Sequence, residues 1–521
     1  MKRDFSLLSG REFDLLVCGG GIYGAWTAYD AALRGLRVAI VEQGDWAGGT
    51  SSASSKLIHG GLRYLETYDF RLVRKALKER QMLLGAAPHR VWPLRFGVPV
   101  YEDSRAGMLK LEAGLTLYDI LAGISGDDMA HRRYSRAGFS GRFAFLRDVS
   151  LRGGFTYGDA QTDDARLVLE LIAGAAEAGA VCVNYCRVTG FNRTNGRVDG
   201  ATVQDRVGQG SAQVSARQIV STTGQWMAAS GPARDWCRLS KGVHLVMPPL
   251  PTTEAFLFTA RSDGRVFFVI PWYGMTLIGT TDTDYSGDLD HVLVEPAEVA
   301  YLLAEANHYL DTKWNEADVV GSYAGVRVMK RSDAASPSAV SRDWELKTAP
   351  DGVHYSVGGK LTSAREDATV IVDTVCGRLG ITSRCATRRR AFPWAPNEDY
   401  AVWLTAARRQ AADLGIDQDS ALWLMRRHGK RVSEVFGLIA AAPRLADRIT
   451  PKLPLIYGDL LLCARDEMVV HLDDLLRRRM PLLILARLDD AGLRGIAGRI
   501  VPVLGWDEGR IGQEIGACRL R

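Results

Sequence analysis

Four basic side chains stand in apolar or glycine-rich contexts, away from charged surface runs. Arg63 follows His-Gly-Gly-Leu, Arg327 follows Ala-Gly-Val, and Lys360 lies between Gly-Gly and Leu-Thr. Arg342 is the fourth of these cations. A guanidinium can bind a phosphate dianion through two parallel hydrogen bonds, and a lysine ammonium adds a point charge. Together these residues favour a site for a small anion, although each of them read alone also fits a solvated surface residue.

One histidine, His244, lies in the largely apolar stretch 241–247 (KGVHLVM). An imidazole has an unperturbed pKa of about 6.5, so it can accept a proton from a hydroxyl group at neutral pH. A lone histidine among apolar residues is also typical of a histidine that is satisfied inside a core. The residues alone leave both interpretations open.

Three glycines near the N-terminus, Gly19, Gly21 and Gly24, form the pattern G-x-G-x-x-G. In dinucleotide-binding proteins the first permits a tight turn, the second lets the backbone approach a pyrophosphate, and the third lets a helix pack close to a strand. Glu42 follows where an acidic side chain hydrogen-bonds a ribose hydroxyl, which disfavours a 2′-phosphate. The glycines alone also fit a simple glycine-rich turn.

The elements that must position this motif are present in the required order. Residues 14–18 (DLLVC) are predicted to form a buried strand, and residues 25–34 a helix that Gly35 ends. Residues 37–41 form a second predicted strand, which leads into Glu42. A helix N-terminus behind the glycines would offer free N–H groups to phosphates. The sequence therefore predicts a dinucleotide-binding unit.

Three later segments favour FAD over NAD as the dinucleotide. Residues 50–65 (TSSASSKLIHGGLRYL) are small and polar, unlike the continuation of an NAD domain. Residues 221–226 (STTGQW) follow an apolar strand, and residues 357–362 (VGGKLT) lie far downstream. Distant segments that return to one ligand are typical of an FAD-binding domain, so FAD is the expected cofactor.

The composition limits the class of protein. The chain has 521 residues, of which 47% are hydrophobic and 24% charged, so two or three folded units are expected. Its net charge of +5 comes from 65 basic and 60 acidic side chains, which argues against a nucleic-acid partner. The 8 scattered cysteines predict no metal site and suit a reducing compartment. No signal peptide or membrane-spanning apolar run is recognisable, so a cytoplasmic location is expected.

From about residue 13 to residue 368, the sequence resembles the FAD-dependent glycerol-3-phosphate dehydrogenase family of the respiratory, aerobic type. The resemblance is most specific in residues 50–66, TSSASSKLIHGGLRYLE. The other matching segments are 19–25 (GGGIYGA), 163–169 (DDARLVL), 241–248 (KGVHLVMP), 269–285 (VIPWYGMTLIGTTDTDY), 323–327 (YAGVR), 341–344 (SRDW) and 358–365 (GGKLTSAR).

The resemblance implies an α/β fold with a glutathione-reductase-like FAD-binding domain interleaved with a mixed-sheet substrate cap. The expected FAD and cap unit spans residues 1–391, with the cap at roughly 75–155 and 240–330. An α-helical C-terminal domain is expected at 392–521, where residues 420–427 and 467–479 show helical periodicity.

The resemblance also implies an activity and the residues that carry it. The family oxidises sn-glycerol 3-phosphate to dihydroxyacetone phosphate by hydride transfer to flavin N5. His244 is expected to take the hydroxyl proton; alternatively, Arg327 holds the alkoxide while His244 orients the hydroxyl. Substrate binding is expected from Arg63, Tyr64, Arg342, Lys360 and Thr362, with Thr280 to Asp282 as a pocket wall. Expected FAD-binding residues are Gly19, Gly21, Gly24, Glu42, Thr50, Ser51, Ser55, Lys56, Leu57, His59, Gly60, Val188, Gly224, Trp226, Gly359, Leu361 and Thr362.

A membrane quinone is the expected electron acceptor, because oxidases of this family carry a large insertion that this chain lacks. Peripheral attachment to the inner face of the cytoplasmic membrane and a homodimer are left open. Candidate attachment surfaces combine basic and apolar residues. They are residues 423–431, residues 475–485, and the basic stretch with Arg71, Arg74, Lys75 and Lys78.

Rival functions follow from departures from the family pattern. Residues 99–155 match loosely, and Tyr23 and Trp26 stand where relatives often carry smaller or different residues. A flavoenzyme for another phosphorylated polyol or a secondary-metabolite intermediate therefore remains an alternative. A catalytically silent flavin-binding protein is a second alternative, although it would need neither the cations nor His244. An amine oxidase would not need so many cations.

Overall fold

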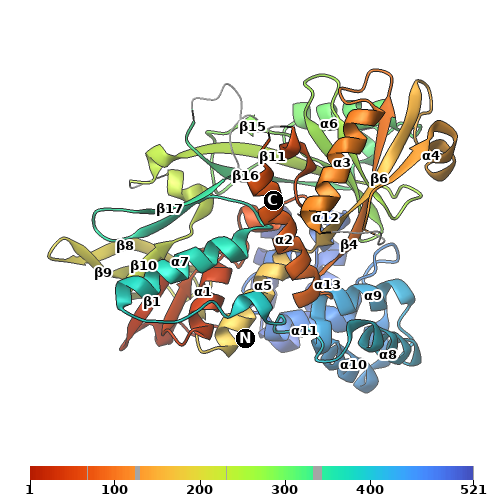
Figure 1. Cartoon of the computed structure of the whole chain (residues 1–521). Helices are drawn as coiled ribbons and strands as arrows, with labels where there is room; N and C mark the ends of the chain where they lie inside the picture. The colour runs from red at the N-terminus through yellow and green to blue at the C-terminus, as the bar shows by residue number, and fades with distance from the viewer. Residues whose placement is uncertain (67, 124–128, 230–231, 333–342, 520–521) are drawn as a thin grey trace.

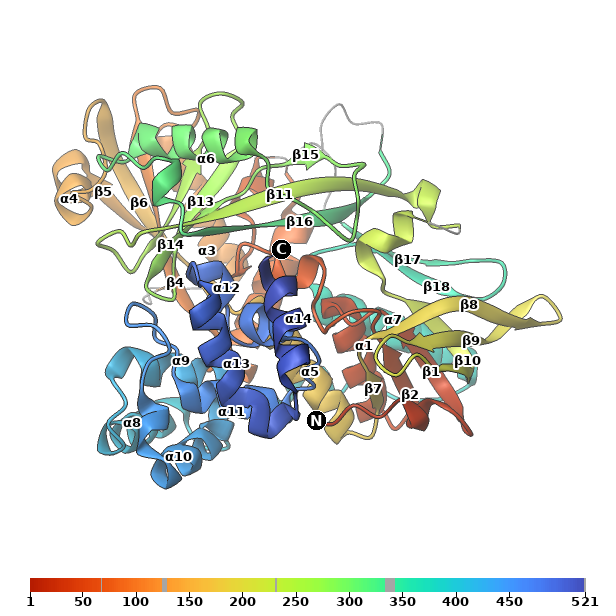
Figure 2. The same ribbon diagram turned by 180° about the vertical axis from the view of Figure 1, so that it is seen from behind.

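The computed structural model describes residues 1–66, 68–123, 129–229, 232–332 and 343–519. Two large sheets lie side by side, and the C-terminal helices pack below the second sheet and beside the first (Figure 1). The view from behind shows the same three parts, with α14 running between the other C-terminal helices and the N-terminal sheet (Figure 2).

The first sheet has β1 near its centre, with parallel strands on both sides. Its order is β17-β18-β10-β1-β2-β7, and β8 and β9 form a hairpin beside β10. The strands are β1 (Glu12–Cys18), β2 (Val38–Val41), β7 (Val181–Val183), β8 (Cys186–Thr194), β9 (Arg197–Asp205), β10 (Ser211–Ser221), β17 (Trp344–Thr348) and β18 (His354–Gly358).

Both faces of this sheet are covered, which explains the nearly continuous apolar run in β1. Leu15 and Val17 pack among the residues of three helices, α1 (Ile22–Leu33), α5 (Asp164–Glu177) and α7 (Ala364–Leu379). The alternate residues of β1 pack in a second cluster with the β8–β10 strands. Since side chains alternate across a strand, a strand buried on both faces must be apolar throughout.

The second sheet has ten strands in the order β15-β11-β14-β13-β12-β4-β6-β3, with β16 beside β11 and β5 beside β6. The strands are β3 (Leu57–Ile58), β4 (Val91–Tyr101), β5 (Arg132–Ser135), β6 (Leu151–Thr162), β11 (Cys237–Met247), β12 (Ala255–Thr259), β13 (Val266–Trp272), β14 (Met275–Gly279), β15 (Thr283–Asp284) and β16 (Gly321–Lys330). The helices near it are α2 (Phe70–Ala86), α3 (Met108–Ala122), α4 (Arg136–Arg142) and α6 (Pro296–Tyr309).

The antiparallel pairing of β11 with β16 matters most for function. In its register Ser240 lies opposite Arg327, and His244 lies opposite Tyr323. His244 is thus four residues along β11 from the position opposite Arg327. Because residues an even number apart share one face of a strand, this register puts the two predicted catalytic side chains on one face of the sheet.

The C-terminal region is helical, so the predicted combination of an FAD-type α/β unit, a mixed second sheet and a helical domain is confirmed. One described helix, Asp474–Arg479, is a π-helix. The α-helices are α8 (Tyr400–Asp413), α9 (Gln418–His428), α10 (Val432–Ala441), α11 (Tyr457–Asp466), α12 (Leu482–Leu485), α13 (Asp490–Leu504) and α14 (Glu508–Arg519).

Buried ion pairs connect this helical domain with the loop after β2 and with α5. Asp45, in the loop after β2, accepts hydrogen bonds from Arg478 and Arg479 at 2.6 Å each. Arg166 of α5 pairs with Glu467 in the same buried layer. Buried charges are tolerated only when they are paired in this way, so the pairs fix how the two units meet.

The packing of the C-terminal domain excludes two of the three expected membrane surfaces. Trp423, Leu424, Met425 and Arg427 are buried, and Arg427 pairs with Asp459. In residues 475–485 most side chains are buried in the domain core. Both segments are therefore ordinary packed helices, and their prediction as attachment surfaces is wrong. In the described part of the chain, no helix combines the length and apolar character needed to cross a bilayer.

Candidate active site

A cavity of about 420 Å³ lies where the carboxyl ends of the parallel strands meet one face of the second sheet. The residues after β1, β2, β10 and β18 line one side, and β11, β13 and β16 line the other. The loops at the carboxyl ends of parallel strands are the usual place for ligands in such sheets. The cavity therefore joins a nucleotide-type cradle to the face that carries Arg327 and His244.

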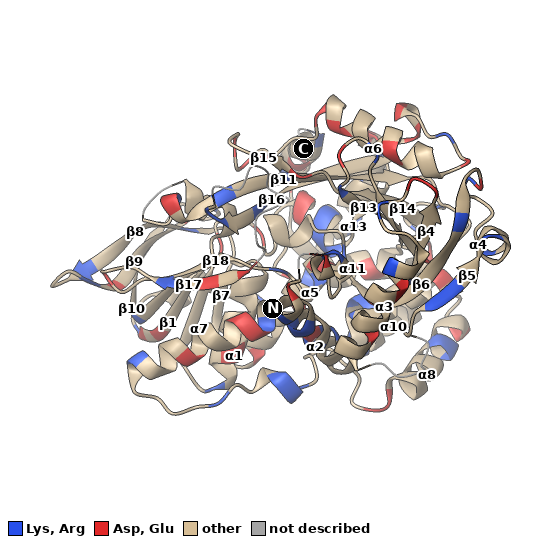
Figure 3. Cartoon of the chain, turned by 45° about the horizontal axis from the view of Figure 1, so that its top comes forward, with Lys and Arg blue, Asp and Glu red and all other residues tan. Residues whose placement is uncertain are grey.

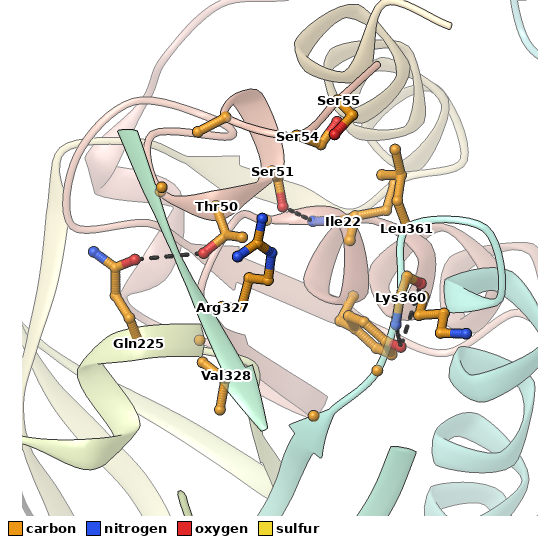
Figure 4. A pocket seen from close by; sticks show the side chains of 18 of the residues that line it. Ile22, Thr50, Ser51, Ser54, Ser55, Gln225, Arg327, Val328, Lys360 and Leu361 are labelled. Carbon is orange, nitrogen blue, oxygen red and sulfur yellow. Dashed lines mark hydrogen bonds between the residues drawn. The ribbon is translucent and has the colours of Figure 1, made fainter. Parts of the chain in front are cut away.

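The glycine turn has the close contacts that the motif predicts. Gly19 has a φ of +111°, and a Cβ atom there would lie 2.6 Å from the carbonyl oxygen of Thr222. A Cβ atom on Gly24 would lie 1.9 Å from the carbonyl oxygen of Gly19, so α1 packs directly on the turn. The Ile22 N–H donates to Ser51 Oγ at 2.9 Å (Figure 4). The start of a helix behind a glycine turn suits a pyrophosphate.

Glu42 directly follows β2 and lines the cavity next to this turn. Its carboxylate accepts hydrogen bonds from the backbone N–H of Gly20 at 2.6 Å and of Gly44 at 2.8 Å. Burial raises the pKa of Glu42, and the two N–H donors oppose that rise. A carboxylate held this way can still accept hydrogen bonds from ribose hydroxyls through its remaining lone pairs.

Residues 50–55 run between the glycine turn and the second sheet. Thr50 Oγ1 donates to the carbonyl oxygen of Val326 at 2.5 Å and lies 3.4 Å from Gln225 Oε1. Figure 4 shows Thr50, Gln225 and Arg327 around one space, from three separate elements. The segment thus connects the cofactor side of the cavity with the strand that carries Arg327.

The Arg327 guanidinium is held in place by the wall formed by residues 280–282. Its Nη2 donates to Thr280 Oγ1 at 2.7 Å, and its Nη1 donates to the Thr281 carbonyl at 3.2 Å. Asp282 Oδ1 lies 3.3 Å from Nη1. These bonds leave the guanidinium in the cavity lining, where it can contact a ligand oxygen. The expected pocket wall is therefore also the support of Arg327.

His244 is buried and stacks on Tyr323 with ring centroids 4.9 Å apart. Its Nε2 lies 2.8 Å from Ser55 Oγ, and Nδ1 has no hydrogen-bond partner among the described residues. Burial lowers the pKa of His244 well below its usual value, and the charges of Arg327 and Lys56 lower it further. A neutral imidazole can act as a proton acceptor, and because Nδ1 is enclosed, Nε2 beside Ser55 is the nitrogen for that role.

Lys360, Tyr64 and Arg63 form a second basic corner of the cavity. The Lys360 ammonium lies 3.7 Å from the centroid of the Tyr64 ring. Arg63 Nη2 donates to the Tyr64 hydroxyl at 3.3 Å. Thr362 Oγ1 accepts the His59 N–H at 3.2 Å, and burial lowers the pKa of the His59 ring to about 4. Two cations beside two hydroxyls suit a phosphate group.

Most of the predicted site residues line this single cavity. They are Gly19, Gly21, Glu42, Thr50, Ser51, Ser55, Leu57, His59, Arg63, Tyr64, Val188, Gly224, Trp226, His244, Arg327, Gly359, Lys360, Leu361 and Thr362. Arg342 lies outside the described residues.

Three predicted cofactor-binding residues lie away from the cavity lining. Gly24 is covered by the Gly19 carbonyl. Lys56 is buried, and its ammonium pairs with Asp164 at 2.7 Å. A Cβ atom on Gly60 would lie 2.5 Å from the Tyr118 hydroxyl, so this glycine packs against α3. All three lie behind the residues that line the cavity.

Some lining residues gave no signal in the sequence. Arg265 comes from the turn before β13, and its Nη1 donates to the Asp282 carbonyl at 2.5 Å. Arg187 lies at the nucleotide end, in a hairpin without a recognisable motif. Only the long-range strand order brings these two side chains to the cavity. Tyr23, which the sequence marked as a departure from the family pattern, also lines the cavity; it is the second residue of α1 and contacts the loop after β18.

The described residues also bring His428, Asp459 and Cys463 close enough to share one ion. His428 Nε2 lies 2.6 Å from Asp459 Oδ1, and Arg427 pairs with the same carboxylate. Arg166 Nη1 lies 3.9 Å from Cys463 Sγ. Two buried guanidinium groups thus already balance the acidic charge, which disfavours a further cation.

Comparison with known proteins shows the family to which the chain belongs. Residues 14–387 match the family described as FAD dependent oxidoreductase, and residues 385–511 match the C-terminal domain of alpha-glycerophosphate oxidase. The glycerol-3-phosphate dehydrogenase of Synechocystis sp. is 34% identical, over 98% of this chain and 97% of that protein. The aerobic glycerol-3-phosphate dehydrogenase of Staphylococcus aureus is 34% identical, over 91% and 87%.

The fold is also similar to that of solved structures. The FAD complex of glycerol-3-phosphate dehydrogenase from Bacillus halodurans superposes with a TM-score of 0.80 at 28% identity, over 99% of this chain and 95% of that one. Glycine oxidase from Geobacillus kaustophilus shares only the fold, with a TM-score of 0.55 at 20% identity over 74% of this chain. The expected cofactor, FAD, is confirmed. The chain belongs to the FAD-dependent glycerol-3-phosphate dehydrogenase family.

Proposed function

We propose that this protein oxidises sn-glycerol 3-phosphate to dihydroxyacetone phosphate with FAD and passes the electrons to a quinone. The observation that carries the proposal is the convergence of Arg63, Arg327, Lys360 and His244 on the cavity that the FAD-binding segments line. Three cations around one cavity favour a dianionic ligand. Relatives that align with at least 91% of this chain bear the name of this dehydrogenase.

The phosphate of the substrate is assigned to the basic corner formed by Arg63, Tyr64 and Lys360. Both cations have side chains fixed against the Tyr64 ring or its hydroxyl, so little conformational freedom is lost on binding. Thr362 adds a hydroxyl on the same side. Arg342, outside the described residues, is the fourth expected cation.

The hydroxyl that loses its proton is assigned to the space between His244 and Arg327. His244 is neutral because its pKa is lowered, so it can accept the proton, while Arg327 stabilises the negative oxygen. FAD, when bound, supplies the hydride acceptor at N5 of its flavin ring. Ser55 and Tyr323 fix the imidazole plane. In the alternative assignment His244 only orients the hydroxyl; the pH dependence of kcat/KM separates the two.

The quinone acceptor requires contact with a membrane, and the surface around α2 fits that purpose. Arg71, Arg74 and Lys78 are exposed and have no ion-pair partner among the described residues. The ribbon of α2 is coloured blue at its Lys and Arg positions in Figure 3. Anionic lipid surfaces attract such cations by about 1 kcal/mol each.

Large apolar side chains lie beside these cations. Tyr68 and Leu109 are each 78% exposed, and Phe70 is 41% exposed. The start of α3 lies next to this segment, because Lys110 and Arg105 both reach Glu66 at 3.9 Å. We name Tyr68, Phe70, Arg71, Arg74, Lys78 and Leu109 the α2 face. Cations flanked by exposed apolar groups are what a monotopic membrane surface needs.

Anaerobic reduction of the bound flavin by a panel of phosphorylated alcohols tests the substrate. Glycerol 3-phosphate should bleach the flavin faster than glycerol, glycerol 2-phosphate or longer phosphorylated polyols. Bleaching only by another phosphorylated polyol would replace the substrate and keep the site. A flavin that no member of the panel reduces would contradict the enzyme assignment.

A further inference from the structure

Tyr23 joins two cofactor-binding elements that are far apart in the sequence. It is the second residue of α1, directly behind the glycine turn, and it lies next to the loop 358–362. The Lys360 backbone N–H donates to the Tyr23 hydroxyl at 3.0 Å, across 337 residues of chain. The Tyr23 ring also stacks on Trp344, with centroids 6.4 Å apart.

The loop is shaped around the phenol group. Gly358 has a φ of +75° and Gly359 a φ of +99°, a backbone conformation that glycine adopts without steric cost. A Cβ atom on Gly359 would lie 1.7 Å from the Tyr23 hydroxyl oxygen. The two glycines thus let the chain wrap over Tyr23, and this places the Lys360 N–H against its oxygen.

A buried carboxylate fixes the direction of the Tyr23 hydroxyl. Tyr23 donates to Asp367 Oδ2 at 2.7 Å, and Asp367 is fully buried in the first turns of α7. Asp367 also accepts from Ser363 Oγ at 3.0 Å and from the Lys75 ammonium at 2.5 Å. Since the phenol donates its only proton to Asp367, its oxygen lone pairs face Lys360.

Lys75 supplies the charge that makes this arrangement stable. Burial raises the pKa of Asp367, and the Lys75 ammonium, 2.5 Å from its carboxylate, acts in the opposite direction. Lys75 comes from α2, so three elements meet at Asp367: α1, α2 and α7. A buried carboxylate that loses its cation is strongly destabilised and tends to take up a proton.

This network determines where the substrate-binding end of the loop lies. Lys360 places its ammonium over Tyr64, and Thr362 bonds to the backbone of His59. Figure 4 shows Lys360 at the edge of the cavity, on the loop that leads to Leu361. A change in the loop backbone therefore moves Lys360 and Thr362 together.

We propose that Tyr23, Asp367 and Lys75 are positioning residues that hold the Lys360 loop in the conformation needed to bind the substrate phosphate. The inference rests on the proposed function for the identity of the substrate, but not for the presence of an anion site. None of the three side chains is assigned a contact with the reacting atoms. Their effect should appear mainly in anion affinity.

Tyr23→Phe tests the proposal, because it removes one hydroxyl and leaves the ring and its stacking in place. The Lys360 N–H and Asp367 each lose a partner, so the loop should shift. The KM for glycerol 3-phosphate and the dissociation constant of inorganic phosphate, read from the flavin spectrum, should both rise about tenfold. The kcat should change by less than about threefold, because His244 and Arg327 are untouched.

Tyr29→Phe is the matched control. It removes a phenol hydroxyl from the same helix, where Tyr29 is buried against Trp26 and away from the loop. Its phosphate affinity should equal that of the unchanged protein. If Tyr23→Phe also bound phosphate with unchanged affinity, the positioning role would be wrong.

Lys75 provides a second, independent variant in case Tyr23→Phe folds poorly. Lys75→Met should weaken phosphate binding about tenfold, and Lys75→Arg should restore most of it, because an arginine keeps the charge beside Asp367. Equal phosphate affinity in Lys75→Met and the unchanged protein would overturn the network. If the unchanged protein binds phosphate but glycerol 3-phosphate fails to reduce its flavin, only the proposed substrate fails, since the phosphate titration still compares the variants.

Discussion

The guanidinium of Arg327 lies directly over Gly242, in the space that any larger residue would fill. A Cβ atom on Gly242 would lie 2.2 Å from Arg327 Nη2 and 2.5 Å from Thr280 Oγ1. The glycine is fully buried within β11, opposite Gly325 of β16. Its missing side chain is what lets the guanidinium reach the cavity along the sheet surface.

Gly242→Ala should therefore reduce activity without removing FAD. The added methyl group would push Arg327 out of its bonds with residues 280–282, and a displacement of about 1 Å at a positioning group costs on the order of 100-fold in rate. Steady-state kcat/KM and flavin content measure the two effects. Gly190→Ala is the control, because a Cβ atom there meets nothing within 4 Å. Normal kcat/KM in Gly242→Ala would show that Arg327 does not need this space.

Arg327→Ala and Lys360→Ala should each cripple turnover while the flavin stays bound. Loss of one partner from a charge-assisted contact costs about 2–5 kcal/mol, or roughly 30-fold to several thousand-fold in kcat/KM. Arg327→Ala should lower kcat, whereas Lys360→Ala should mainly raise KM. Near-normal kcat/KM with glycerol 3-phosphate in both variants would contradict the site assignment.

The pH dependence should reveal His244 as an unusually acidic imidazolium. Its pKa is lowered, so the neutral form persists below pH 6.5, and protonation at lower pH removes the proton acceptor. After correction for the second ionisation of the substrate phosphate, near pH 6, kcat/KM should stay level from pH 8 to 6.5 and fall only well below that. His244→Asn should lose most activity at every pH. An acidic limb at or above pH 6.5, or a His244→Asn variant with high kcat, would favour the orienting role.

Membrane binding should depend on the α2 face. Changing Arg71, Arg74 and Lys78 together to Glu should weaken binding to vesicles with anionic lipid by about 3 kcal/mol or more, roughly a hundredfold. Flotation with such vesicles at low salt measures the bound fraction, and added salt should reduce it. Quinone-dependent turnover should fall in parallel.

The control for that experiment reverses three exposed cations on the C-terminal domain, Arg408, Arg409 and Arg494. This variant has the same net charge as the α2-face variant, so it separates a local surface from a general charge effect. If both variants float like the unchanged protein, or if the unchanged protein does not float, the α2 face is not a membrane surface.

Asp45→Asn should lower the stability of the whole chain. Arg479 would lose its carboxylate partner inside the protein, and breaking a buried ion pair from one side costs about 3–5 kcal/mol. Thermal and denaturant unfolding measure the loss. Glu508→Gln, which breaks an exposed pair with Arg494, should change stability by at most about 1 kcal/mol. Equal effects of both changes on stability would mean that the buried ion pairs of Asp45 add little to the free energy of unfolding.

The N-terminal unit could be predicted closely because its signals are local. The predicted strand 14–18, helix 25–34 and strand 37–41 correspond to β1, α1 and β2. A glycine pattern, apolar runs and a helix-ending glycine act over a few residues, so one sequence suffices to find them.

The C-terminal helices were predicted less well where side chains override periodicity. Residues 420–427 lie within α9, but of residues 467–479 only the last part is helical. Asp474 accepts the backbone N–H groups of Val470 and His471 at 3.0 and 2.9 Å, so the chain turns there before the helix starts. Side chain to backbone bonds of this type compete with helix formation.

The candidate site, too, could be predicted only in part from the sequence. Arg327, Lys360 and His244 were found from their local contexts or from the family resemblance. Their orienting contacts with Ser55, Gly242 and Tyr23 could not be predicted, because these contacts depend on strand register and loop packing. Lys56 was expected at the cofactor, but its nearest acid, Asp164, is 108 residues away in the chain.

The strand order of the first sheet also determines how late in synthesis the cavity for FAD can close. β1 is synthesised first, but its partner β10 pairs with it through residues 215–221, which are synthesised about 200 residues later. The loop that Tyr23 contacts is synthesised later still, because it ends at Thr362. Until that loop has left the ribosome, a nascent chain has a glycine turn but no closed cavity around a flavin. We therefore expect FAD to bind late in synthesis, and we expect fragments truncated before Thr362 to bind FAD more weakly than the 521-residue chain.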